Sequence, residues 1–216
     1  MSAYQELKHF LEQDPDNTAL RLDCADAAIA EDAFDDAMTL LVPLAEKGEP
    51  KAIGLMGLID LRKGEHEAAA KTFGMLMDGG IDDPGLRFNL AWSLAHLKRF
   101  EDALEVLTDD AARSLPQGAM LRVQLLHQLE RFEDAADMAR AYVELFPDYP
   151  GLLAAASTIA MDTDDAEWAQ ELAARAPDHP EAKVTLATLN LSRETRQTHP
   201  PCSTKSSRSD LMPLAR

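Results

Sequence analysis

The sequence predicts an all-α solenoid of about five to six helical hairpins, and three observations carry this prediction. Proline recurs at intervals of 34, 32, 34 and 30 residues, at Pro50, Pro84, Pro116, Pro150 and Pro180. Each proline opens an apolar run of helical period, which a polar break separates from a second helical pattern. Strand signals are nearly absent, because neither β-branched alternation nor Asn-Gly hairpins occur.

The helical units can be placed in order along the chain. Residues 2–14 are expected to form an N-terminal capping helix, because stacked repeats need an end unit that covers their apolar faces. The hairpins follow near residues 17–48, 49–80, 83–114, 115–147 and 149–177, with a partial unit at 179–191. Proline suits the first turn of a helix, where its missing N–H has no partner to lose.

The second helix of each hairpin opens in a similar way. The recurring pattern ends in alanine and carries acidic residues, as in Phe34-Asp35-Asp36-Ala37, His66-Glu67-Ala68-Ala69, Phe100-Glu101-Asp102-Ala103 and Phe132-Glu133-Asp134-Ala135. Acidic residues in a first turn interact favourably with the positive end of the helix dipole. The alanines let paired helices approach closely, and Gly64 is expected to cap the helix before it.

These patterns resemble the tetratricopeptide repeat family, whose unit is a helix–turn–helix of 34 residues. The resemblance covers Ser2 to Leu191 and is carried by the segments Ile53–Phe73 and Asn89–Ala103, and by Pro15 and Pro147 at repeat ends. It implies a right-handed superhelix in which the first helix of each repeat lines a concave groove. Arg21, Arg87 and Ala119 depart from the family, which often has a large aromatic residue at these positions.

Residues 192–216 do not continue the pattern. Residues 193–216 hold five basic and two acidic residues, whereas residues 1–192 carry a formal charge of −20. A disordered basic tail and a translational frame change near Leu191 are both open interpretations. Either one leaves the sixth repeat incomplete, with an apolar face that could support dimerisation.

Composition restricts the classes of partner. The 216 residues include 38 acidic and 21 basic ones, for a formal charge of −17, which disfavours nucleic acid and anionic membrane surfaces. Basic protein partners remain open, although solubility alone would account for the charge. The sequence has no long apolar run, no signal-like N-terminus and only two cysteines, which together favour a cytoplasmic protein. The Ala- and Asp-rich composition suggests a bacterial one.

Residue patterns for catalysis are missing. The sequence has neither a Gly-rich phosphate loop nor a Gly-x-Ser-x-Gly motif, and its six histidines lack metal-ligand spacing. Cys24 lies on a small-residue helix face, where a packed thiol is expected. We therefore expect a protein that is not an enzyme and needs no cofactor or metal.

The resemblance implies candidate binding residues along the groove. Matching the first helices position by position selects Arg62, Phe88, Trp92, His96, Gln124 and His127 as a peptide-binding set, with Lys51, Gly54, Leu58, Gln128 and Thr158 among further groove positions. Aromatic anchors beside hydrogen-bonding groups suit an apolar peptide or helix. The alternative is that Phe88 or Trp92 packs against the neighbouring repeat.

The leading functional hypothesis is a non-enzymatic adaptor that binds a basic or apolar segment of a protein in the concave groove. A self-assembling homo-oligomeric scaffold is the first alternative, motivated by the incomplete sixth repeat. A chaperone for secreted or aggregation-prone clients is the second, motivated by the acidic charge.

Overall fold

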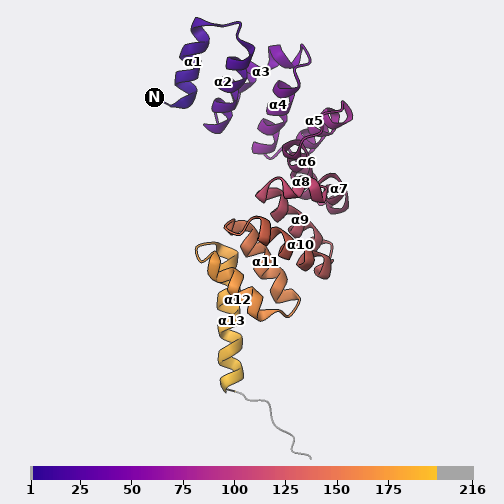
Figure 1. Ribbon diagram of the computed structural model, residues 1–216. Helices are drawn as coiled ribbons and strands as arrows, with labels where there is room; N and C mark the ends of the chain where they lie inside the picture. Colours follow the sequence, from indigo (N-terminus) through magenta and orange to yellow (C-terminus); the bar gives the residue numbers. More distant parts are fainter. Residues whose placement is uncertain (1, 199–216) are drawn as a thin grey trace, which may run out of the picture.

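The computed structural model describes residues 2–198, and within this range the regular structure is entirely helical. The helices stack in chain order from α1 at one end of an elongated molecule to α13 at the other (Figure 1). Their bounds are α1 Ala3–Gln13, α2 Thr18–Ala30, α3 Phe34–Ala45, α4 Pro50–Arg62, α5 His66–Asp78, α6 Pro84–His96, α7 Phe100–Val106, α8 Asp109–Arg113, α9 Pro116–Gln128, α10 Phe132–Leu145, α11 Pro150–Asp162, α12 Ala166–Arg175 and α13 Pro180–Thr198.

The helices pair as the sequence predicts. Helix α1 packs on α2, and the pairs α2/α3, α4/α5, α6/α7, α9/α10 and α11/α12 each pack as neighbours. Helix α13 packs against both α11 and α12. The described residues therefore form a capping helix, five hairpins and one further helix, which confirms the predicted helical-repeat solenoid.

The starts of the helices follow from individual residues. Proline is the first residue of α4, α6, α9, α11 and α13. At some helix starts a side chain caps the first turn: Asn17 accepts a hydrogen bond from the Leu20 N–H at 3.0 Å, and Asp83 accepts one from the Leu86 N–H at 2.9 Å. The predicted contact alanines of the second helices are fully buried, at Ala37, Ala69, Ala103 and Ala135.

The turn inside each hairpin contains one residue with a positive φ. These residues are Asp32, Gly64, Lys98, Glu130 and Asp164. The expected cap at Gly64 is confirmed, and the same backbone conformation occurs at this position in the other four hairpins. The following N–H bonds to a carbonyl five residues back, as in Ala33 to Ala28 at 2.8 Å and Glu65 to Asp60 at 2.8 Å. This is the Schellman arrangement, which satisfies carbonyls that a helix end leaves free.

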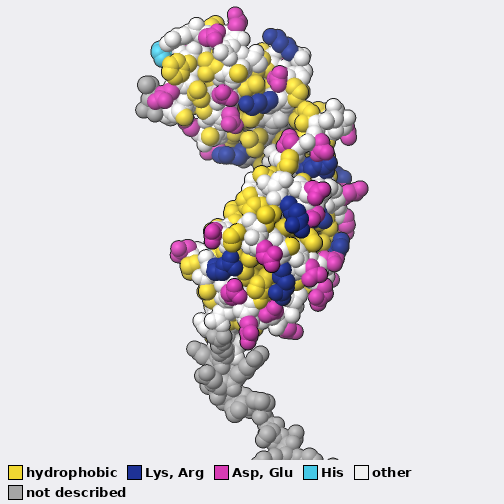
Figure 2. Space-filling model, viewed as in Figure 1, with side chains coloured by type: hydrophobic (Ala, Val, Ile, Leu, Met, Phe, Trp, Pro, Cys, Tyr) yellow, Lys and Arg dark blue, Asp and Glu magenta, His cyan; other side chains and the backbone are white. Residues whose placement is uncertain are grey.

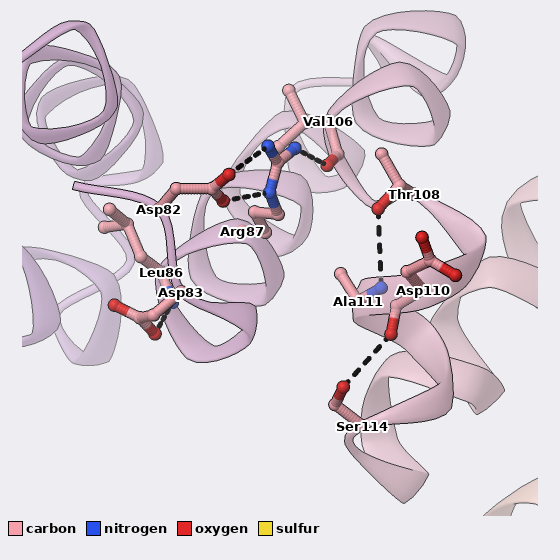
Figure 3. A network of polar contacts seen from close by, with 9 residues as sticks. All are labelled: Asp82, Asp83, Leu86, Arg87, Val106, Thr108, Asp110, Ala111 and Ser114. Carbon is pink, nitrogen blue, oxygen red and sulfur yellow. Dashed lines mark hydrogen bonds and ion pairs between the residues drawn. The ribbon is translucent and has the colours of Figure 1, made fainter. Parts of the chain in front are cut away.

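The third hairpin departs from a simple helix pair. Its second helix is broken between Val106 and Asp109, and Thr108 caps the new helix α8 (Figure 3). Arg87 donates to the Val106 carbonyl at 2.9 Å while its guanidinium also contacts Asp82, at 2.6 Å from Nε. Arg122 of α9 donates to the carbonyls of Leu104 and Leu107. Two arginines thus satisfy carbonyls that the break releases.

The buried side chains form two main clusters. One runs from Tyr4 to Ile59 and the other from Ala69 to Ala182, so the division falls between α4 and α5. In the space-filling view the outline of the molecule narrows near this point (Figure 2). The solenoid is therefore continuous in its helices but divided in its core.

The C-terminal helix extends further than the partial repeat expected at 179–191. Helix α13 continues to Thr198, so residues 192–198, which the sequence pattern places in the atypical tail, are helical in backbone. Its exposed side chains include Val184 at 65% and Leu191 at 63%. The remaining predicted tail, residues 199–216, lies outside the described residues. None of the described helices is both long and apolar enough to cross a membrane.

Candidate functional site

A cavity of about 410 Å³ lies between α6, α9 and α11, close to the start of α13. Four of the six predicted site residues line it: Trp92 and His96 from α6, and Gln124 and His127 from α9. The remaining lining residues are Ala95, Phe100, Leu121, Val123, Leu125, Gln128, Ala155, Thr158, Ile159 and Glu181. We call this cavity the Trp92 pocket.

Trp92 has two sets of neighbours. Its half-buried ring packs against the larger core cluster and also lines the Trp92 pocket, so both of its expected roles correspond to contacts in the structure. The ring centroid of Phe88 lies 5.9 Å away and that of His96 lies 4.8 Å away. The His96 Nδ1 atom is 3.0 Å from the Trp92 carbonyl oxygen, a geometry that requires the proton on Nδ1. These contacts hold the indole in place at the pocket wall.

Two imidazole rings stack behind the pocket. His66, the first residue of α5, lies with its ring centroid 4.2 Å from that of His96. Burial of His66 lowers its pKa, and the nearby His96 lowers it further. Two adjacent protonated imidazoles would repel each other, so the stack favours the neutral form of His66.

The residues from α9 differ in how they are held. The His127 Nε2 atom lies 2.8 Å from Asp162 Oδ2 at the end of α11, and the ring makes an edge contact with Phe132. Gln124, one helical turn before Gln128, is half-buried, and its amide makes no hydrogen bond within the described part of the chain. The amide is therefore free to bind a ligand, whereas His127 is already positioned by a carboxylate.

Two predicted site residues lie elsewhere. Arg62, at the end of α4, donates to Asp32 at 2.7 Å and is not part of the pocket wall. Phe88 is half-buried against the larger core cluster beside Trp92 and does not line the pocket either.

A second cavity of about 410 Å³ lies between α4, α5 and α6. Three groove positions expected from the sequence line it, namely Lys51, Gly54 and Leu58. A Cβ atom placed on Gly54 would lie 3.7 Å from Leu76 Cδ1, so the glycine contributes to the open space. Helix α6 thus has a cavity on each side.

Sequence reasoning missed several residues of the Trp92 pocket. The missed apolar wall consists of Leu121, Leu125, Ala155 and Ile159. The groove positions were chosen about every four residues along each first helix, and these four residues lie between them. Glu181 was missed because the groove pattern was not extended into the partial sixth repeat. The signal was available, since Glu181 follows the repeat-opening Pro180.

A metal-binding role finds no support in the side-chain arrangement. Within residues 2–198, no three His, Cys, Asp or Glu side chains gather closely enough to hold a metal ion. Cys24 is buried, and burial raises the pKa of its thiol, which disfavours the reactive thiolate.

Comparison with known protein families gives a match over the N-terminal part of the chain. A tetratricopeptide repeat family model matches residues 2–59. No curated protein matches the sequence. The resemblance to tetratricopeptide repeats is therefore confirmed by sequence over α1 to α4, and the solved structures extend the shared fold to most of the chain.

Several solved structures share the fold, among them two tetratricopeptide repeat proteins, YrrB and TTC0263. YrrB, described as having an unusual peptide-binding site, is 17% identical with a TM-score of 0.64, and the match covers 86% of this chain and 100% of YrrB. TTC0263 from Thermus thermophilus is 21% identical with a TM-score of 0.61, covering 81% and 99% of the two chains. PilF from Pseudomonas aeruginosa is 12% identical with a TM-score of 0.73, covering 84% and 86%. At these identities the matches show the fold alone.

Proposed function

We propose that this tetratricopeptide-type solenoid is a non-enzymatic adaptor that holds a segment of another protein against its first helices. The observation that carries the proposal is the Trp92 pocket, in which an aromatic ring, apolar walls and hydrogen-bonding amide groups come together. Its volume falls within the range of about 300–1,000 Å³ that is typical of ligand pockets.

The chemistry of the pocket suits side-chain recognition. Leu121, Leu125 and Ile159 provide apolar wall, while Gln124 and Thr158 provide hydrogen-bonding groups. Buried aromatic residues surrounded by such groups often carry most of the energy of a protein interface. One of the solved relatives in fold, YrrB, is described as having a peptide-binding site, which supports this class of function.

The test is an affinity capture from the native lysate with three forms of the full chain. The wild type is compared with a pocket variant, Trp92→Ala plus Gln124→Ala, and with the control Phe10→Ala, which removes an exposed aromatic residue from α1. We expect a protein that both wild type and control retain and the pocket variant loses. Circular dichroism establishes that the pocket variant is folded. Equal retention by all three forms would contradict a binding role for the pocket.

Self-association is a second candidate function, and the exposed face of α13 favours it. Val184 and Leu191 are seven residues apart on this helix and are 65% and 63% exposed. A residue spacing of seven places both side chains on one side of a helix. If this face pairs two copies, Val184→Glu should convert a dimer to a monomer in light scattering, and a wild type that is monomeric at all concentrations rules the pairing out.

A further inference from the structure

The wall of the Trp92 pocket is negative in character. Its one acidic residue is Glu181, which is exposed and makes no ion pair within the described residues, and no described lining residue is Lys or Arg. Asp162 adds a second carboxylate just behind the wall, where it contacts His127. A positively charged group in this pocket would therefore be attracted by the carboxylates and would not be repelled by a Lys or Arg side chain of the wall.

The ends of four helices meet at the pocket. His96 is the last residue of α6 and Gln128 is the last residue of α9, and both line the pocket. The C-terminal end of a helix carries a partial negative charge of about half an elementary charge, because its last carbonyl groups lack intrahelical partners. Phe100, the first residue of α7, and Glu181, in the first turn of α13, line the pocket too, so helix ends of opposite polarity offset one another and Glu181 is the fixed charge of the wall.

The remaining wall distinguishes among cations. The indole of Trp92 can interact with a cation through its ring, and Leu121 and Ile159 offer apolar surface to a methylene chain. Gln124 and Thr158 offer oxygen acceptors to a group with several N–H donors. An arginine side chain matches all of these groups, because it combines an apolar stem, a planar cation and five N–H donors.

We propose that the partner segment inserts an arginine side chain into the Trp92 pocket, with its guanidinium directed to the carboxylate of Glu181. This inference rests on the proposed adaptor function and specifies the partner that the adaptor recognises. A lysine would keep the charge but offer fewer donors, and a leucine would fill the apolar part while leaving the glutamine amides and Glu181 without partners. The formal charge of −17 on the chain would in addition speed the approach of a basic segment.

Glu181 also has a structural role that the test must separate. It lies in the first turn of α13, where a carboxylate favours the positive end of the helix dipole. Glu167 holds the same position in α12 and does not line the pocket, so Glu167→Gln is the matched control for Glu181→Gln.

The experiment begins with a random 12-residue peptide display library selected on the full-length wild type. Peptides that also bind Trp92→Ala are discarded. We expect the selected peptides to share an arginine. One of them is then synthesised with Arg, Lys, Gln or Leu at that position, and its Kd is measured for each protein form at two salt concentrations.

The expected pattern is specific to the proposal. Replacing the arginine by Leu should weaken binding to the wild type by at least about tenfold, and replacing it by Lys by less. Glu181→Gln should weaken binding of the Arg peptide by about threefold to fivefold and leave the Leu peptide unchanged, since only the Arg peptide pairs with the carboxylate. Glu167→Gln should change neither, and added salt should weaken the Arg peptide most.

Each contrary outcome has a distinct meaning. Selected peptides that share an apolar residue and no basic one would overturn the arginine inference and leave the adaptor function standing. An Arg peptide that Glu181→Gln binds as tightly as the wild type would overturn the assigned role of Glu181. A library that yields no peptide dependent on Trp92 would count against the adaptor function itself.

Discussion

At the scale of single residues, Tyr142 makes a polar contact inside the core. Its side chain is fully buried, and its hydroxyl donates to Asp109 Oδ1 at 2.6 Å. Burial raises the pKa of Tyr142, and the hydrogen bond to Asp109 raises it further, so the hydroxyl stays protonated and able to donate. The same carboxylate accepts a hydrogen bond from Arg113 of α8 at 2.8 Å, so Asp109 joins Tyr142 of α10 to α8.

Removing that hydroxyl should cost measurable stability. We expect Tyr142→Phe to lower the free energy of unfolding by about 1–2 kcal/mol, because a hydrogen bond to a charged acceptor is lost while the ring packing is kept. Urea denaturation measures the change. Tyr149→Phe is the control, since the Tyr149 hydroxyl has no hydrogen-bond partner within the described residues. Equal losses in the two variants would show that the contact with Asp109 contributes nothing.

His66 makes stability depend on pH. Its pKa is lowered in the folded state by burial and by His96, whereas in the unfolded chain it is near 6.5. Between these two values only the unfolded chain binds the proton. The free energy of unfolding should therefore fall as the pH drops below about 6.5 and level off below the folded pKa.

His66→Phe should remove this part of the pH dependence while keeping an aromatic ring against His96. The measurement compares the free energies of unfolding at pH 7.5 and 5.5 in both proteins. We expect the wild type to lose more stability than the variant over this interval. The opposite order would show that burial of His66 does not penalise its charged form.

At the scale of elements, two of the glycines in the α4/α5 hairpin, Gly64 and Gly74, have opposite roles. Gly64 has φ +81° in the turn, and a Cβ atom added there would meet nothing within 4 Å, so its requirement is one of backbone conformation alone. Gly74 lies inside α5, and a Cβ there also meets nothing within 4 Å. Replacement by alanine should thus change the free energy of unfolding in opposite directions at these two positions, although neither position is sterically crowded.

Gly64→Ala should destabilise the protein by about 1–2 kcal/mol, because the left-handed conformation is unfavourable for residues with a Cβ. Gly74→Ala should stabilise it by roughly 0.5–1 kcal/mol, because alanine has the higher helix propensity. Thermal unfolding of both variants checks the signs. A rise in stability with Gly64→Ala would mean that the turn tolerates a different backbone conformation.

The elements also show which parts of the structure can be predicted from the sequence. The helix starts at Pro50, Pro84, Pro116 and Pro150 were predictable, because a residue at the start of a helix acts locally. The break after Val106 was not, because it depends on Arg87 and Arg122, which reach it from other helices. Lys98 and Glu130 show the same limit, since they adopt positive φ values without the glycine that would have signalled them.

The candidate site follows the same rule. Trp92, His96, Gln124 and His127 were predictable because groove positions repeat along each first helix, and the structure brings these four side chains to one cavity. The apolar wall at Leu121 and Ile159 depends on how neighbouring helices are offset, which a single repeat does not encode. Arg62 was included by position, but it ends α4, a helix that does not line the pocket, and there it pairs with Asp32.

At the scale of the whole molecule, the division of the core matters most. The N-terminal cluster ends with Ile59 in α4, and the larger cluster begins with Ala69 in α5. Contact across this boundary is nevertheless close, because a Cβ on Gly57 would lie 2.9 Å from Phe73 Cε1. In solenoids each repeat contacts mainly its neighbours, so stability is nearly a sum of local terms. A defect in one cluster should therefore spread only partly into the other.

Leu41→Ala tests this partial independence. Leu41 is fully buried in the N-terminal cluster, and its truncation should cost about 2–5 kcal/mol there. Amide hydrogen exchange should then speed up in α2–α4 while α9–α11 keep most of their protection, since local opening no longer requires the larger cluster to open. Leu172→Ala, which truncates a fully buried residue of the larger cluster, should give the reverse pattern. Uniform acceleration of exchange along residues 2–198 in both variants would instead mean that the Gly57–Phe73 contact makes the two clusters unfold as one unit.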